Sequence, residues 1–151
     1  MGKKFFMVVI AFIIMATYLP LTSCAQTRIL SDFPSGNGVE KVFISKSMLN
    51  MGLPRKEFFN YRNMFGEVQG MEIYNCGNSS LAPSVKSKTE DFLKKYHAEL
   101  MLESEDGGEK SMIYTLFEEK NKEKTVGMAI INYEGNEINI VILHGDVLIP
   151  Q

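Results

Sequence analysis

Residues 125–143 read TVGMAIINYEGNEINIVIL, and this stretch decides the fold. Two apolar runs, 125–133 and 138–143, flank the turn-forming residues Glu134-Gly135-Asn136. Short runs rich in β-branched residues on either side of such a turn are typical of a β-hairpin. In both runs apolar residues occupy odd-numbered and even-numbered positions, so both faces of each strand are apolar. Central strands have this pattern when both faces of a sheet are covered. A strand whose outer face meets a partner protein would look the same.

The chain before this hairpin continues the strand pattern. Residues 99–105 and 111–117 each predict a strand, and the residues between them include Asp106-Gly107-Gly108, a strong hairpin signal. Residues 118–124 are mostly charged and predict a loop. We therefore expect four consecutive strands with no helix between them.

Two helices and two strands are expected further upstream. Strands are predicted at 39–45 and 71–74, and Ser45 or Ser47 can cap a short helix that runs to Met51. A longer amphipathic helix is predicted from Pro83 to about His97. The aromatic segment 58–65 is ambiguous, and its role stays open.

The order strand, helix, strand, helix and four strands predicts an α+β domain. We expect a mostly antiparallel sheet with helices packed on one face. The two helical crossovers also allow the first strands to pair in parallel.

Residues 1–24 have the layout of a bacterial export signal. Lys3 and Lys4 give a positive start, and residues 5–21 carry no charge. Leu21-Thr22-Ser23-Cys24 looks like a lipobox, the motif of lipoproteins in which the cysteine becomes the mature N-terminus and carries acyl chains. We predict a lipoprotein signal peptide at 1–23, with lipobox residues Leu21, Thr22 and Ser23 and lipid attachment at Cys24.

Two alternatives for this segment stay open. An ordinary secretory signal would be cleaved after Ala25, because Ser23-Cys24-Ala25 also fits a small-x-small site. The product would be a secreted, soluble periplasmic protein. An uncleaved membrane helix is the third interpretation, although the apolar run of about 17 residues is short for a bilayer and contains Pro20.

The rest of the chain predicts a tether and one domain. Residues 24–38 end in Pro34, Ser35 and the run Gly36-Asn37-Gly38, which lack periodicity and predict a flexible tether. Residues 39–151 are then a single α+β domain. Without Lys3 and Lys4, 14 of the 16 basic residues are left against 18 acidic ones, a net charge of −4. Phosphate contacts need a basic surface, so no nucleic-acid partner is expected.

Candidate chemical groups are few and scattered. His97 and His144 lie far apart in sequence, and His144-Gly145-Asp146 offers two ligands where zinc takes at least three from protein; a turn is the ordinary explanation. Cys76 fits a buried, inert cysteine better than a reactive thiol. The acidic group Glu103, Glu105, Asp106 and Glu109 fits a solvated hairpin. We therefore expect no catalytic residue, no metal and no cofactor.

Three motifs carry a resemblance to a known family. Residues 44–49, ISKSML, resemble the opening motif of the family called domain of unknown function 4252. Residues 96–101, YHAELM, look like its helix-to-strand junction, and residues 143–147, LHGDV, like its C-terminal signature. The similarity covers roughly residues 39–147. The family is typical of exported proteins of Bacteroidetes, often with lipoprotein signals, and it brings no established activity.

A function follows as a hypothesis. We expect a cell-envelope lipoprotein, a non-enzymatic binding module held at the membrane by its N-terminal acyl chains, with a possible protein partner. A regulatory partner in envelope sensing is the alternative, and an envelope hydrolase is third. In lipoproteins of the Bacteroidetes type an acidic run after the cysteine marks export to the outer face. Ala25-Gln26 starts no such run, which favours an outer-membrane lipoprotein facing the periplasm.

Overall fold

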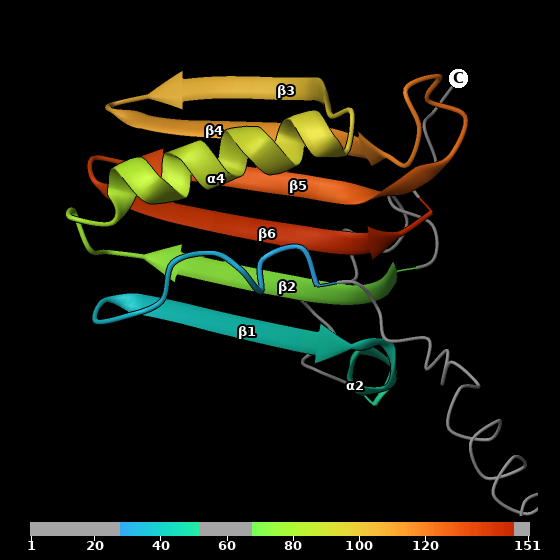
Figure 1. The fold of residues 1–151 in the computed structure, drawn as a ribbon, viewed down its shortest axis with the longest axis horizontal. Helices are drawn as coiled ribbons and strands as arrows, with labels where there is room; N and C mark the ends of the chain where they lie inside the picture. Colours follow the sequence, from blue (N-terminus) through green and yellow to red (C-terminus); the bar gives the residue numbers. More distant parts are fainter. Residues whose placement is uncertain (1–27, 52–67, 147–151) are drawn as a thin grey trace, which may run out of the picture.

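A computed structural model describes residues 28–51 and 68–146, which form a six-stranded antiparallel sheet and two helices (Figure 1). The elements are β1 (Val39–Ser45), α2 (Lys46–Asn50), β2 (Val68–Cys76), α4 (Ala82–Lys95), β3 (Glu99–Asp106), β4 (Glu109–Phe117), β5 (Thr125–Glu134) and β6 (Glu137–Gly145). The predicted α+β class and the order of the elements are confirmed. The aromatic segment 58–65 and the predicted signal with Cys24 lie outside the described residues.

The strand order is β1-β2-β6-β5-β4-β3, and every neighbouring pair is antiparallel. The allowance for parallel pairing of the first strands was wrong. β2 and β3 run in the same direction, because α4 returns the chain to the end of the sheet where β2 began. They are not paired, however, because β6, β5 and β4 lie between them in the sheet. The hairpin of β5 and β6 supplies the antiparallel partner that β2 takes instead, from Gly70 to Cys76.

The two predicted hairpins are confirmed. Asp106 pairs with Glu109 and Glu134 pairs with Glu137, so each loop contains two residues. In the first loop Gly107 and Gly108 both have positive φ angles, 58° and 91°. This is the combination that a type I′ hairpin turn requires and that glycine adopts without a steric penalty.

The two helices do not share one face, which corrects that part of the prediction. α4 lies across the front of the sheet in Figure 1 and buries Ala82, Val85, Thr89 and Phe92. α2 has five residues and none of them is buried. It continues from the end of β1, where the Ser45 side chain accepts a hydrogen bond from Met48 N at 3.4 Å, as the predicted cap does. One and a half turns cannot form an apolar stripe wide enough to cover a sheet.

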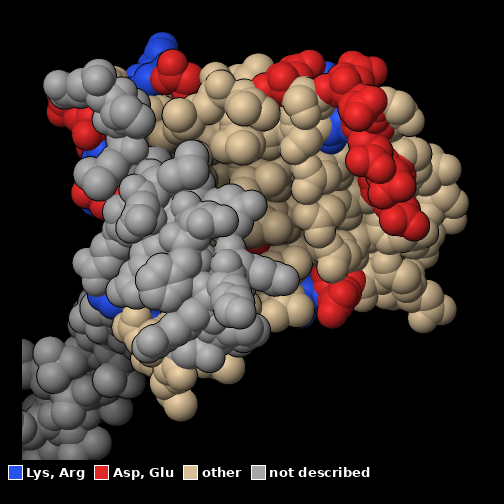
Figure 2. All heavy atoms as spheres, turned by 180° about the vertical axis from the view of Figure 1, so that it is seen from behind, with Lys and Arg blue, Asp and Glu red and all other residues tan. Residues whose placement is uncertain are grey.

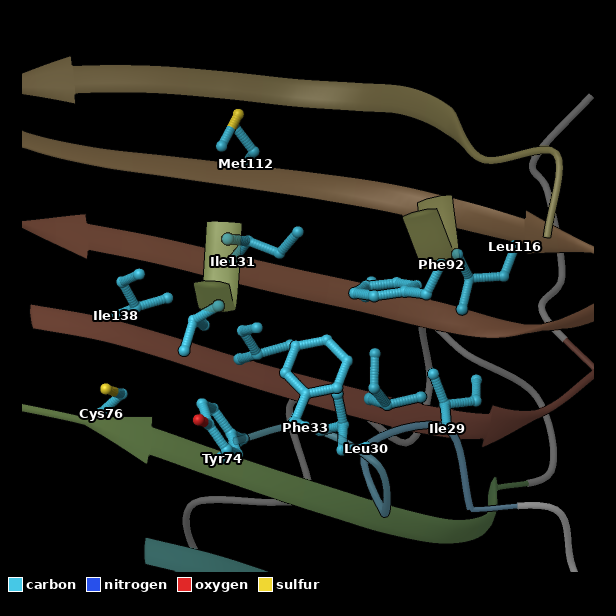
Figure 3. Packing of buried hydrophobic residues seen from close by; sticks show 14 of the residues in the cluster. Ile29, Leu30, Phe33, Tyr74, Cys76, Phe92, Met112, Leu116, Ile131 and Ile138 are labelled. Carbon is cyan, nitrogen blue, oxygen red and sulfur yellow. The ribbon is translucent and has the colours of Figure 1, made fainter. Parts of the chain in front are cut away.

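The main core lies between α4 and the front face of the sheet (Figure 3). Phe92 of α4 packs there with Leu116 and Ile131, which come from β4 and β5. Full burial of one such side chain contributes about 1.5–3 kcal/mol. A smaller cluster on the back face contains Met71, Met128 and Leu143. The apolar residues on both faces of β5 and β6 therefore belong to two separate clusters.

Residues 28–38 are not a flexible tether, which corrects the predicted boundary of the domain at residue 39. Ile29, Leu30 and Phe33 are buried in the main core. Their segment crosses the front of the sheet beside α4 (Figure 1). Within the described residues, no helix is both long and apolar enough to cross a membrane.

Candidate functional site

The N-terminal segment, residues 28–34, is bound to the sheet by apolar contacts. Phe33 lies with its ring centroid 5.2 Å from that of Tyr74 on β2 and 5.9 Å from that of Phe92 on α4. Ile29 and Leu30 lie beside them at the edge of the same cluster (Figure 3). The segment therefore covers a part of the main core that α4 does not cover.

A buried carboxylate fixes the start of this segment. Glu72 of β2 is 3% exposed, and it accepts hydrogen bonds from Ile29 N at 2.9 Å and from Leu30 N at 3.0 Å. His144 of β6, 9% exposed, places its Nε2 atom 2.6 Å from Glu72 Oε2. Both carboxylate oxygens thus have partners, which a buried polar group needs because it has lost its water.

A cation and a phenol fix the other end of the segment. Lys41 Nζ donates to the carbonyl oxygens of Ser31 at 3.2 Å and Phe33 at 2.5 Å. The Tyr74 hydroxyl donates to Pro34 O at 2.8 Å. Free N–H groups at the start of the turn thus meet an anion, and carbonyls at its end meet a cation.

Burial raises the pKa of Tyr74 to about 12, and the nearby Cys76 adds to the shift. The folded state therefore favours the neutral phenol, whereas an unfolded tyrosine ionises near pH 10. Stability from Tyr74 is complete below pH 10 and is lost as the pH rises toward 12.

We predict that Tyr74→Phe lowers the free energy of unfolding at pH 8 by about 1 kcal/mol, because it removes the bond to Pro34. The difference between wild type and variant should shrink between pH 10 and pH 12. Urea unfolding of both proteins at pH 8 and pH 11 checks this. A difference that stays constant or grows with pH would contradict the assignment to Tyr74.

The other sequence candidates serve the fold. Cys76 is buried and points its thiol at Asn78 O, 3.6 Å away. His97 has a φ angle of 45° just after α4, where His97 N bonds to Lys94 O and Ala98 N to Leu93 O. This is the Schellman pattern that ends a helix. Among the described residues, no group of three acidic, histidine or cysteine side chains could hold a metal ion.

The prediction of a turn at His144 was wrong, and the buried pair was missed. His144 belongs to β6, and Asp146 after it accepts a hydrogen bond from Thr125 Oγ1 at 2.8 Å. One signal for Glu72 was present: alternation along residues 71–74 places Glu72 on the same face as Tyr74. No local signal identified its partners, because His144 is 72 residues away.

Two open depressions hold mixed polar groups. A groove of about 310 Å³ between the N-terminal segment and α4 is lined by charges of both signs, including Arg28, Asp32, Lys88, Asp91 and Lys95. A depression of about 330 Å³ at the turn end of the sheet is lined by Asn75, Asn132, Asn139, Glu134 and Glu137, with Cys76, Gly77 and Ile138. In the second depression the Cys76 thiol is directed at the backbone carbonyl of Asn78.

A row of polar side chains crosses the back of the sheet beside the second depression. Hydrogen bonds join Glu40 to Asn75, Asn75 to Asn139, Asn139 to Asn132, and Asn132 to Ser111. The next row on that face is acidic, because Asp106, Glu109, Glu134 and Glu137 are cross-strand neighbours. Figure 2 shows acidic side chains gathered at this end of the sheet. Opposed like charges are unfavourable, so this end would attract a cationic partner.

β3 is the most exposed element of the sheet. All eight of its residues are exposed, including Leu100, Met101 and Leu102 in succession. It pairs only with β4 within the described residues, so its outer N–H and C=O groups form an open edge. The strand contains four acidic residues and no basic one.

The comparisons with known proteins give a family. The family model described as Domain of unknown function (DUF4252) matches residues 33–149. The match begins at Phe33, inside the N-terminal segment that is packed on the sheet. No curated protein and no solved structure matches the chain. The family model covers most of the sequence, and the chain therefore belongs to the DUF4252 family, a domain of unknown function.

Proposed function

We propose that this protein is a non-enzymatic binding module of the cell envelope, held at the membrane by acyl chains on Cys24, which binds an extended, basic segment of a partner protein along β3. The exposed edge of β3 is the observation that carries the binding part of the proposal. The lipobox-like sequence Leu21-Thr22-Ser23-Cys24 supports the membrane part.

An edge strand of this kind is a template for another strand. Unpaired backbone groups on an edge can bind an extended segment by main-chain hydrogen bonds, while pockets and charges select its side chains. The three apolar residues 100–102 supply contact area at one end of β3. Glu105 and Asp106 supply negative charge at the other end, next to the acidic row that ends at Glu137.

The charges favour a basic partner over a second copy of this chain. A second β3 paired antiparallel across a twofold axis would bring four more acidic residues to the same edge, of which Glu99 and Glu103 form ion pairs with Lys122 and Lys110 of their own domain. This pairing would also place the acidic residues of one β3 opposite either the apolar residues 100–102 or the acidic residues of the other copy. Like charges directly opposite are destabilising, so the strand discourages pairing with itself.

Photo-crosslinking in the envelope tests the proposal. With a photo-crosslinking residue at Met101, which is exposed, we expect one covalent product with another protein. Glu105→Lys should reduce its yield at least threefold, because a lysine there repels a basic segment. Glu123→Lys, an exposed acid in the loop before β5, is the matched control and should leave the yield unchanged.

Two results would overturn the binding proposal. One is a product that contains two copies of this chain. The other is a yield that Glu105→Lys does not change. Identification of the partner as a membrane-bound signalling protein would assign the protein a regulatory part in envelope sensing.

A further inference from the structure

We propose that the corner of the domain formed by Arg28 and α2 faces the lipid surface, with Met48 and Met51 in contact with the bilayer. This inference rests on the proposed acylation of Cys24. It concerns a part of the molecule that the partner-binding edge does not use.

The length of the chain between Cys24 and Arg28 is the first argument. Four residues span at most about 14 Å when fully extended. Arg28 is fixed, because its guanidinium lies over the Phe43 ring of β1, 4.1 Å from the centroid, and because Glu72 binds the next two backbone N–H groups. An acyl group on Cys24 would therefore hold this part of the sheet beside the headgroups.

The side chains at this corner are the second argument. Phe43 lies two residues before Ser45, the cap of α2, so Arg28 lies near the end of β1 from which α2 continues. Figure 1 shows α2 at this end of the sheet. Met48 is 54% exposed and Met51 is 86% exposed. Met51 is the more exposed of the two and directly follows α2. Exposed apolar side chains close to a lipid anchor add to membrane affinity when they leave water and enter the interface.

The position of β3 agrees with this orientation. β1 and β3 are the two outer strands, with five inter-strand spacings between them. At about 4.8 Å for each spacing, β3 lies about 24 Å from β1. A membrane at the corner of β1 and α2 therefore leaves the edge of β3 free for a partner.

Lipid-borne quenching tests the orientation on the full-length acylated protein in vesicles. An environment-sensitive fluorophore is attached to Met51→Cys, and in a second protein to Met101→Cys on β3 as the matched control. Quenching by nitroxide lipids should be at least threefold stronger at residue 51 than at residue 101. Wild type treated in the same way reports background labelling of the buried Cys76.

The outcomes separate this inference from the proposed function. If the protein stays with the vesicles but residue 51 is quenched no more than residue 101, the orientation is wrong and the acylation stands. If the protein leaves the vesicles, as a Cys24→Ala variant that cannot be acylated is expected to do, the proposed acylation of Cys24 and the orientation that rests on it are both overturned. Circular dichroism of both labelled proteins confirms that each exposed substitution leaves the fold intact.

Discussion

Replacing Glu72 by alanine is expected to lower the free energy of unfolding by about 3–5 kcal/mol, because it leaves several buried hydrogen-bonding groups without a partner, at a cost of about 1–3 kcal/mol for each. The carboxylate has three partners, the backbone N–H groups of Ile29 and Leu30 and the His144 ring. All three lie in or next to the core, where water cannot replace the lost acceptor. The loss in free energy of unfolding should therefore be several times larger than the loss caused by shortening a surface glutamate.

Urea unfolding with matched variants measures this effect. Glu40→Ala removes an exposed carboxylate from the neighbouring strand and should change stability by no more than about 0.5 kcal/mol. The double variant Glu72→Ala with His144→Ala should be less destabilised than the sum of the single variants, because the two residues share one contact. A loss below 1 kcal/mol for Glu72→Ala would show that the pair does not hold the segment.

The same variant reports on the docking of the N-terminal segment. Without Glu72, trypsin should cleave the peptide bond after Arg28 under conditions in which the rest of the domain is still folded. Release of the start of the segment, with Lys41 still bound to Ser31 O, would also lengthen the chain between Cys24 and the first fixed residue from four residues to seven, which reach up to about 25 Å instead of about 14 Å. The buried pair therefore contributes to how closely an acylated protein would sit to its membrane.

Local sequence signals accounted for most of the sheet. The turns at Gly107-Gly108 and Gly135-Asn136 are encoded by residues that adopt the required backbone angles, so the hairpins could be placed within a residue or two. The helix after Pro83 could be placed because its apolar residues recur on one face. Each of these features depends on neighbours within a few positions.

Features that depend on distant partners could not be predicted in this way. Ile29, Leu30 and Phe33 are only three apolar residues between polar ones, and their burial depends on the space that α4 leaves open over β2. The pairing of β2 with β6 joins residues about 70 positions apart. The exposure of Leu100, Met101 and Leu102 in β3 was equally hidden, because apolar residues of an edge strand and of a central strand share the same local pattern.

Gly127→Ala is expected to destabilise the protein by about 3 kcal/mol, at the upper end of the cost of overpacking a core. Gly127 lies in β5 opposite His144 of β6. A Cβ atom added there would overlap the carbonyl oxygen of Leu143, which belongs to the backbone of β6. A flexible side chain could turn away, but a strand paired on both sides cannot move without breaking its ladder.

Gly77→Ala is the matched control for this close approach. An added Cβ at Gly77 would meet only Gly38 O at 3.9 Å, an ordinary contact, so this variant should unfold within about 0.5 kcal/mol of wild type. Equal stability of the Gly127 and Gly77 variants would mean that β5 and β6 are further apart at this point. The position of His144 beneath the N-terminal segment would then need revision, because the residue that pairs with Gly127 is the one that binds Glu72.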